Sequence, residues 1–459
     1  MISDVSRRAF LQRASALSIA GAATPFVLNL AAIGEAAAAT ASDYKAIVCV
    51  FLYGGNDYAN TLIPADTANY NLYNAQRSAL AYSQASLAGT TLAPTVPLAG
   101  GRSYAIAPEL APILPIFNAG KMAVMLNIGT LVQPTTKTQY TNKSVPLPPK
   151  LLSHNDQQSY WQSSSPEGAS SGWGGRIGDL LQSGNANPSL TCMNPAGNAV
   201  FMSGVTAVQY SLTSNGAIAL NARTSLQGST AAGTALRSLI STPVNHMLET
   251  ELTKVSGRAL NLYDLVTNSL AIAPTTNTVF PAAADPGSTL GAQLKQVARL
   301  ISVSSQLGAK RQVFFVSTGN FDTHDGILTV HPRLMTNLAD ALRAFYDTTV
   351  ELGVANQVTT FTASDFGRAL TANNDGSDHG WGSMHFVLGG AVKGKAYYGT
   401  PPVVANNGPD DIGQGRLIPT TSVDQYAATM ASWFGVSDSD MPTVLPNIGN
   451  YTTKNLGFV

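Results

Sequence analysis

The sequence predicts an α/β protein with a doubly wound, mostly parallel sheet that carries helices on both faces. Apolar runs rich in β-branched and aromatic residues recur along the chain, as is typical of strands buried on both faces. Segments with apolar residues at helical spacing lie between several of these runs. Strands that alternate with helices favour a parallel sheet over an antiparallel one.

The predicted strands are apolar segments that end in glycine or polar residues. The first, KAIVCVFLY (45–53), is followed by the Gly54-Gly55 turn. The others lie at 121–130, 311–324, 356–368 and 384–392. In an open α/β sheet the ligand site lies beyond the carboxyl ends of the strands, so the residues after these segments are candidate site residues.

Helices are predicted at 290–308, 334–353 and 423–435, where apolar residues recur at helical spacing. The last of them begins after Ser422, with Gln425 three residues further on. That pair predicts a capping box, in which each side chain accepts a hydrogen bond from the other residue's backbone N–H. Gly435 is the predicted C-cap.

The organisation predicted from these elements is one domain over 40–459. Two stretches, near 67–120 and 195–289, are irregular and rich in small polar residues, and we interpret them as insertions. No fixed-period repeat is present, and no linker divides the chain into two domains.

Residues 1–39 are predicted to be a targeting segment. Ser6-Arg7-Arg8-Ala9-Phe10-Leu11-Gln12 resembles the twin-arginine export signature, an Ala/Gly-rich apolar stretch follows it, and Ala36–Ala39 offers a cleavage site. The alternative is an N-terminal membrane anchor, which the glycine, proline and asparagine in the stretch disfavour. We therefore expect a periplasmic or secreted protein without a stable membrane span once the leader is removed.

The overall charge argues against a nucleic-acid partner. The chain has 26 basic and 26 acidic residues, and only 11% of its residues are charged, so no basic surface follows from composition. Its two cysteines, Cys49 and Cys192, are too few for a zinc cage. Cys49 is expected to be a buried thiol, and a disulfide between the two is left open.

Aspartates and histidines collect after several predicted strands, although the chain has only six histidines. Each motif alone is compatible with an ordinary turn. Together, so many carboxylates and imidazoles would repel or lack partners unless they bind a cation, and their donor types suit Zn²⁺, Mn²⁺, Ca²⁺ or Mg²⁺. The candidates are Asp57, Ser153, His154, Asp322, His324, Asp365, Arg368, Asp378 and His379. We interpret His246 and His331 as structural and leave His385 open.

Six motifs in this order, the leader, FLYGGNDYAN, SHNDQQSYWQ, FDTHDG, SDFGR and DHGWGSMHFVLGGAVKGKAYYG, resemble bacterial exported proteins of domain-of-unknown-function family 1501. The resemblance covers nearly all of the chain beyond the leader. That family is grouped with the alkaline phosphatase and sulfatase superfamily, so the resemblance implies an alkaline phosphatase-like fold. It also implies one or two divalent metal ions and a hydroxyl or cysteine-derived nucleophile.

The resemblance also implies roles for individual residues. Asp57, Asp322, His324, Asp365 and His379 are the implied metal ligands, and Asp378 is either a further ligand or a group that orients His379. Ser153 is the implied nucleophile, with His154 beside it, and Arg368 is the implied anion-binding residue. This sequence departs from the pattern at Phe366, which stands where the superfamily has a histidine, and at Asp365, where family members usually carry glutamate.

Two functions remain open at this point. The first is an exported metal-dependent hydrolase that acts on a phosphate or sulfate ester of a small molecule or glycan. The second is a non-catalytic periplasmic protein on the same fold that binds a glycan, a lipid or a protein. An electron-transfer protein is disfavoured, because the sequence has no cysteine cluster, haem motif or dinucleotide fingerprint.

Overall fold

The computed structural model describes residues 44–459, apart from 221–223, 244 and 285–286. The predicted leader at 1–39 lies outside the described residues. Within the described residues, no helix combines the length and the apolar character needed to cross a bilayer.

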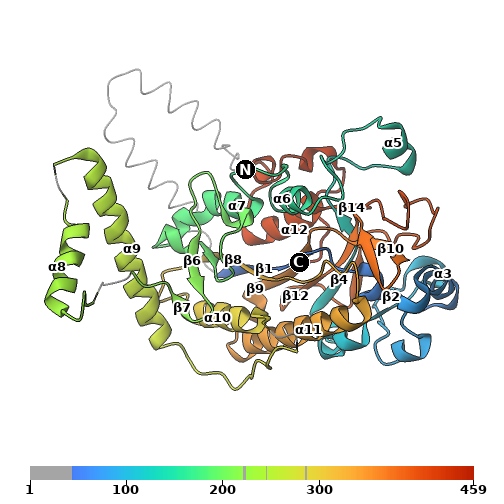
Figure 1. The fold of residues 1–459 in the computed structure, drawn as a ribbon, viewed down its shortest axis with the longest axis horizontal. Coiled ribbons are helices and arrows are strands. Elements are labelled where there is room, and N and C mark those ends of the chain that lie inside the picture. Colours follow the sequence, from blue (N-terminus) through green and yellow to red (C-terminus); the bar gives the residue numbers. More distant parts are fainter. Residues whose placement is uncertain (1–43, 221–223, 244, 285–286) are drawn as a thin grey trace, which may run out of the picture. The chain divides into compact units, whose positions relative to one another are not determined.

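A central sheet of ten strands organises the fold (Figure 1). Its strand order is β13-β4-β12-β9-β1-β8-β5-β6-β7, with β14 paired to β4. The bounds are β1 Lys45–Leu52, β4 Met122–Gly129, β5 Cys192–Asn194, β6 Tyr210–Thr213, β7 Gly216–Ala217, β8 Arg311–Thr318, β9 Val358–Ser364, β12 Ser383–Gly389, β13 Ala396–Tyr398 and β14 Thr421–Ser422. All five predicted strands are present, and the α/β class with a mostly parallel sheet is confirmed.

The strand β12 differs from the others in direction. β1 runs parallel to both β8 and β9, whereas β12 is antiparallel to β9 and to β4. Since β12 is antiparallel to both, β4 and β9 run the same way. The residues that precede β12 therefore lie at the edge where β1, β4, β8 and β9 end.

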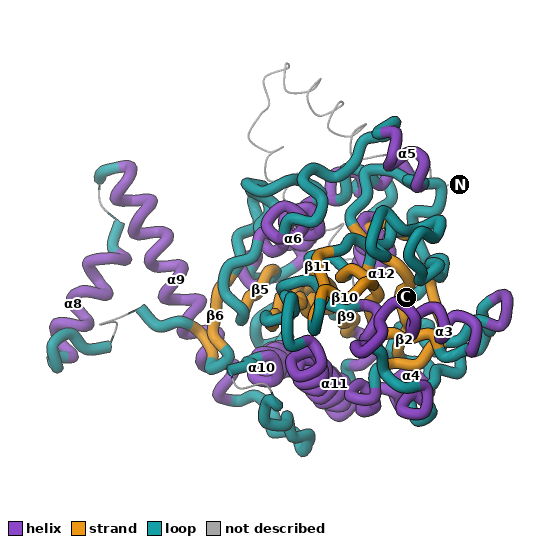
Figure 2. Tube along the Cα trace, turned by 45° about the vertical axis from the view of Figure 1, so that its right-hand side comes forward, coloured by secondary structure: helices purple, strands orange, loops and turns teal. Residues whose placement is uncertain are grey.

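Helices cover both faces of the sheet, as expected for a doubly wound fold. Alternate residues of β1 point to opposite faces, so Val48 and Val50 join one core while Ile47 and Cys49 join the other. The first core packs against α10 (Leu290–Ser302) and α11 (Ile327–Glu351). The second packs against α6 (His154–Ser163), α7 (Trp173–Leu181) and α12 (Val423–Phe434). Figure 2 shows α10 and α11 along one side of the strands.

The predicted ends of α12 are confirmed. Both hydrogen bonds of the capping box form, from the Gln425 N–H to the Ser422 hydroxyl and from the Ser422 N–H to the Gln425 side chain, and Gly435 is the C-cap. The helix predicted at 334–353 begins earlier, at Ile327. Pro332 is therefore the sixth residue of α11, beyond the first turn, where a proline removes one hydrogen bond of the helix.

The two stretches interpreted as insertions carry short elements. The first contains α3 (Thr67–Arg77), β3 (Tyr104–Ile106) and α4 (Leu114–Asn118), and β3 pairs antiparallel with β2 (Leu62–Pro64), which precedes the stretch. The second contains α8 (Thr230–Ser241) and α9 (Met247–Ala271). The remaining elements are α5 Lys137–Asn142, α13 Met441–Val444, and the two-stranded sheet of β10 Arg368–Asn373 with β11 Gly376–His379.

Cys49 in β1 and Cys192 in β5 are both buried and both free. Burial raises the pKa of the Cys192 thiol to about 12. A thiol held neutral at physiological pH is a poor nucleophile, so neither cysteine is a candidate for covalent chemistry.

Two buried histidines make the fold sensitive to acid. Burial lowers the pKa of His385 to about 3 and, as its largest cause, that of His331 to about 4. The unfolded chain therefore takes up protons below about pH 6.5 that the folded chain excludes, and stability is lost as the pH falls through that range.

We expect His385→Gln to lose less stability between pH 7 and pH 5 than the unchanged protein, by about 2 kcal/mol. Urea unfolding at the two pH values measures this difference. The comparison uses the change with pH, so any constant cost of replacing the imidazole cancels. Equal pH dependence in the two proteins would contradict a neutral, buried His385.

Candidate metal centre

Histidine and aspartate side chains from three parts of the chain meet at the carboxyl edge of the sheet. His154 is the first residue of α6, which follows β4. Asp322 and His324 lie in the loop after β8, and His379 ends β11, just before β12. Ligand atoms of His154, Asp322 and His379 all lie within 4.8 Å of one another. Figure 2 shows α6 and β11 near each other, as the contact between His154 and His379 requires.

The ring of His379 is oriented by a backbone carbonyl. Its Nδ1 lies 2.7 Å from the oxygen of Leu152. A carbonyl oxygen only accepts, so Nδ1 carries the proton and the neutral ring presents a lone pair at Nε2. Leu152 has φ of 73°, a left-handed conformation that costs a leucine about 1–2 kcal/mol. That strained backbone aims the carbonyl at His379.

The ring of His154 is oriented by Asp365 in the same way. Its Nδ1 lies 2.7 Å from Asp365 Oδ2, so Nδ1–H donates and the neutral ring presents its lone pair at Nε2. The hydrogen bond to this carboxylate raises the pKa of His154 above its usual value, and partial burial opposes the rise. For His379, burial lowers the pKa, while the Leu152 carbonyl opposes the change.

These two lone pairs point at each other. The Nε2 atoms of His154 and His379 are 3.0 Å apart, and His379 Nε2 is also 2.9 Å from His324 Nε2. A single proton placed between His379 Nε2 and one of the other two rings relieves the repulsion in only one of these two contacts. A cation relieves both, because imidazoles are strong metal ligands once the other nitrogen is held by a hydrogen bond.

Asp322 completes the group with both carboxylate oxygens. Its Oδ2 is 3.4 Å from His154 Nε2, and its Oδ1 is 3.4 Å from His379 Nε2 and 3.1 Å from His324 Nε2. Donor atoms bound tetrahedrally at 2.0–2.1 Å lie roughly 3.3 Å from one another. The spacing of His154, Asp322 and His379 therefore fits a single divalent cation, and His324 lies beside this group, in contact with His379 and Asp322.

Arg368 holds Asp322 in place. Its Nη1 donates to Asp322 Oδ1 at 2.8 Å and to the Gly54 carbonyl at 3.0 Å, and its Nε and Nη2 donate to the Ser377 carbonyl. Partial burial would raise the pKa of Asp322, but this hydrogen bond and the nearby positive charges lower it overall. The guanidinium is fully buried, so the structure uses Arg368 to fix a carboxylate and does not turn it towards solvent.

Asp365 lies behind His154. The side chain is 1% exposed, and Oδ2 accepts from the Gly54 N–H, from Gln158 Nε2 and from His154 Nδ1. Three donors leave this oxygen no room for a cation. The structure thus gives Asp365 an orienting role through Oδ2, while its Oδ1 is buried with no hydrogen-bond partner among the described residues.

Asp378 supports His324 and not His379. Its Oδ1 lies 3.4 Å from His324 Nδ1 and accepts from Asn373 Nδ2 at 3.0 Å. Of the two roles that the sequence left open for Asp378, the structure supports the orienting one, directed at a different imidazole.

Gly54 connects the parts of this centre. Its N–H binds Asp365 and its carbonyl binds Arg368. Its φ is +116°, and a Cβ at this position would lie 2.4 Å from the backbone nitrogen of Asp322. Only glycine combines this backbone conformation with such a close approach, which explains the turn after the first strand.

The structure does not bring Asp57 to the cluster. Its carboxylate is paired with the guanidinium of Arg77 in α3, and both side chains are fully buried. Arg77 also donates to the carbonyls of Ala369 and Leu370 in β10. Asp57 therefore anchors α3 to β10, because the chain turns its side chain away from the edge where the histidines meet.

Ser153 does not face the cluster either. It is the N-cap of α6, and its hydroxyl donates to Asp156 Oδ2 at 2.9 Å. Among the described residues, no serine or threonine hydroxyl is within hydrogen-bonding distance of His154, Asp322, His324 or His379. The arrangement thus provides no side-chain nucleophile at the cluster.

Phe366 packs against two of the imidazoles of the cluster. Its ring centroid lies 4.8 Å from that of His154 and 4.9 Å from that of His379. The phenyl ring contacts both imidazoles and restricts their rotation. The remaining donor set, three imidazoles and one carboxylate, suits Zn²⁺ or another transition metal better than Ca²⁺ or Mg²⁺, which prefer oxygen ligands.

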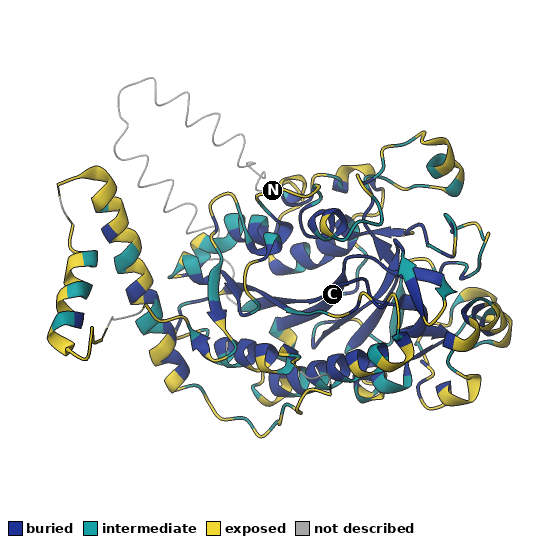
Figure 3. Ribbon diagram, in the orientation of Figure 1, coloured by how far each residue is buried: buried dark blue, intermediate teal, exposed yellow. Residues whose placement is uncertain are grey.

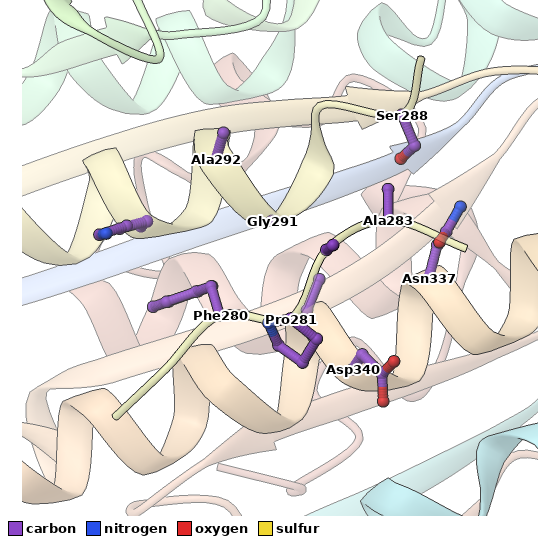
Figure 4. A pocket seen from close by; sticks show the side chains of 11 residues that line it. Phe280, Pro281, Ala283, Ser288, Gly291, Ala292, Asn337 and Asp340 are labelled. Carbon is purple, nitrogen blue, oxygen red and sulfur yellow. The ribbon is translucent and has the colours of Figure 1, made fainter. Parts of the chain in front are cut away.

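A cavity of about 270 Å³ lies away from the cluster, between residues 280–283, α10 and α11 (Figure 4). None of the site residues predicted from the sequence lines it.

Two contributors to the centre were not predicted. Gln158 stands four residues after His154 on α6, a spacing that places two side chains on the same helix face, so its place behind Asp365 was available from the sequence. The role of the Leu152 carbonyl could not be predicted from the sequence. Its left-handed backbone conformation is usually signalled by glycine or asparagine, and this position is a leucine.

Comparison with known proteins gives a family but no activity. No curated protein matches the chain. Two solved structures are similar to it: Ps i-CgsB in complex with k-i-k-neocarrahexaose (8% identity, 88% of this chain and 77% of that chain, TM-score 0.36) and the PsFucS1 sulfatase from Pseudoalteromonas sp. (9% identity, 90% and 72%, TM-score 0.36). We base no functional inference on similarity at this level. The family model described as "Protein of unknown function (DUF1501)" matches residues 44–445, and the chain belongs to that family.

Proposed function

We propose that this protein is a divalent-metal-dependent hydrolase of a phosphate or sulfate ester, with His154, Asp322, His324 and His379 as the metal ligands. The observation that carries the proposal is the convergence of three imidazole Nε2 atoms and one carboxylate, with the other nitrogen of two rings fixed by Leu152 and Asp365. When bound, a divalent cation supplies a water of lowered pKa and withdraws charge from an ester oxygen.

The exposure of the cluster favours catalysis over a purely structural metal. His154 and His379 are 26% and 25% exposed, and Asp322 and His324 are both 44% exposed. Structural zinc sites are closed, whereas catalytic sites keep a position open to water and substrate. The exposure of this cluster therefore resembles that of a catalytic metal site.

The protein's own residues orient the metal ligands and attract the anionic substrate. Leu152 and Asp365 hold two imidazoles, Arg368 holds Asp322, and Asp378 supports His324. Arg416 lies beside the cluster, with Nε on the His379 carbonyl and Nη2 3.9 Å from Asp378. Because it is 21% exposed at its side chain, we assign the attraction of the anionic ester to Arg416, in place of the buried Arg368.

Water is the proposed nucleophile, since the Ser153 hydroxyl is bound to Asp156. The substrate class that we propose is an anionic small-molecule or glycan ester. Export through the twin-arginine route is part of the same proposal and rests on the leader at 1–39 alone.

The lack of a side-chain nucleophile favours one second candidate, a non-catalytic protein that binds a glycan, lipid or protein through the same metal. Both candidates predict bound metal, and only the first predicts turnover. An assay for hydrolysis therefore separates them.

We expect the purified protein to contain about one divalent ion per chain by elemental analysis and to cleave aryl sulfate or aryl phosphate. Chelation should abolish turnover, and Zn²⁺ should restore it. Metal binding without turnover of either ester class would support the binding protein, and a chain as active after chelation as before would refute the metal-dependent hydrolase.

A further inference from the structure

The helix α9 carries an apolar stripe that the described chain covers over only half of its length. Leu248, Leu252, Val255 and Ala259 follow one another at intervals of four, three and four residues, the spacing of a coiled-coil seam. The stripe continues to Leu262 and Val266, which are buried in the main core. Its first half is open to solvent, with Leu248 71%, Leu252 64% and Val255 52% exposed.

The neighbouring helix α8 does not cover this stripe. The face of α9 towards α8 carries the buried residues Thr253 and Leu260, and a Cβ on Gly257 would lie 3.8 Å from the Ser241 side chain. At 100° per residue, that face is separated from the stripe by roughly a third of a turn. Figure 3 shows mainly exposed residues along α8 and along the first half of α9.

We propose that two copies of this chain associate through this stripe, with their α9 helices packed antiparallel about a twofold axis. A symmetric contact requires a surface complementary to itself. Around an axis midway between Thr253 and Lys254, Leu252 meets the partner subunit's Val255, and Leu248 meets the partner subunit's Ala259. Each apolar residue then faces another.

The charges beside the stripe favour this register. Glu251 and Arg258 are both exposed and lie on the same flank of the stripe, seven residues apart. Within its own chain Glu251 pairs with Lys254 at 2.7 Å, and this pair is exposed (60% and 62%) and therefore weak. In the antiparallel pairing, Glu251 of one copy lies beside Arg258 of the partner subunit, and the twofold axis repeats the contact. In a parallel pairing, Glu251 faces Ser256 and Arg258 faces Tyr263, so neither meets a complementary charge. The flanking charges thus select an antiparallel second copy as the occupant.

The expected association is weak, because the seam is short. We expect a monomer–dimer equilibrium with a dissociation constant on the order of micromolar, measured by sedimentation velocity over a range of protein concentrations. Leu252→Glu should raise that constant at least tenfold. The control, Val96→Glu, alters an equally exposed apolar residue (75% exposed) away from α9 and should leave the constant unchanged.

Charge exchange tests the register. Glu251→Arg and Arg258→Glu should each weaken the dimer about three- to tenfold, and the double exchange should restore it. Circular dichroism of each variant checks that α9 remains helical, so that weakening is attributable to the interface.

A protein that stays monomeric at all concentrations would overturn the proposal, as would a dimer that Leu252→Glu leaves intact. Failure of the double exchange to restore the dimer would overturn the antiparallel register. Binding of the monomer to vesicles of phosphatidylethanolamine and phosphatidylglycerol, abolished by Leu252→Glu, would identify a membrane surface as the occupant instead.

Discussion

His379→Ala is expected to weaken Zn²⁺ binding by more than about 100-fold and to abolish any metal-dependent turnover. The Nε2 of this residue is the atom that the other imidazoles approach, at 3.0 Å from His154 and 2.9 Å from His324. Loss of a group that merely orients a ligand costs about 10–100-fold in affinity, and loss of the ligand itself should cost more. Competition with a chromophoric chelator measures the affinity.

The matched control is His246→Ala. His246 is an exposed histidine at the N-cap of α9, so its replacement removes one imidazole without touching the cluster. Equal zinc affinity in the two variants would show that the cluster is not the binding site. A second comparison, Asp365→Asn, should lower the affinity by about 10–100-fold, since the amide still fills the space behind His154 but no longer supplies a charge.

Arg77→Leu is expected to destabilise the protein by about 3–5 kcal/mol, because it leaves the carboxylate of Asp57 buried without its partner. Both side chains are fully buried, and water cannot replace the guanidinium. Urea unfolding gives the free energy. The control, Arg237→Leu, breaks a pair with Asp264 in which both side chains are more than a third exposed, and it should cost about 1 kcal/mol or less.

This variant also separates two roles of Asp57. If Asp57 only anchors α3 to β10, the folded fraction of Arg77→Leu binds Zn²⁺ within about threefold of the unchanged protein. A stable Arg77→Leu protein with altered zinc affinity would indicate that Asp57 is a metal ligand, as the sequence suggested.

The five long strands of the sheet could be predicted from the sequence, because strands buried on both faces are apolar throughout and stand out from the chain around them. The five short strands, β5, β6, β7, β13 and β14, were not predicted, since two to four residues carry no recognisable pattern. The direction of β12 could not be predicted either. Its residues are as apolar as those of a parallel strand, and direction depends on which neighbours it pairs with. That direction matters for the site, since it brings His379 to the edge where β8 and β9 end.

The sequence indicated which residues gather near the site better than it indicated what each of them does there. His154, Asp322, His324 and His379 do meet. Asp57, Asp365 and Arg368 follow strands at the same edge but turn into the protein, where they bind Arg77, His154 and Asp322 respectively. A motif places a residue at the end of a strand, whereas the direction of its side chain depends on partners outside the motif, here 20, 46 and 211 residues away.

Anomalous diffraction at the zinc absorption edge, from crystals of the protein grown with Zn²⁺, tests the central claim most directly. We predict one strong peak about 2.0–2.1 Å from the Nε2 atoms of His154 and His379, with Asp322 and His324 around it and Asp57 still paired with Arg77. A zinc peak bound elsewhere, with the imidazoles of His154 and His379 free of metal, would contradict it.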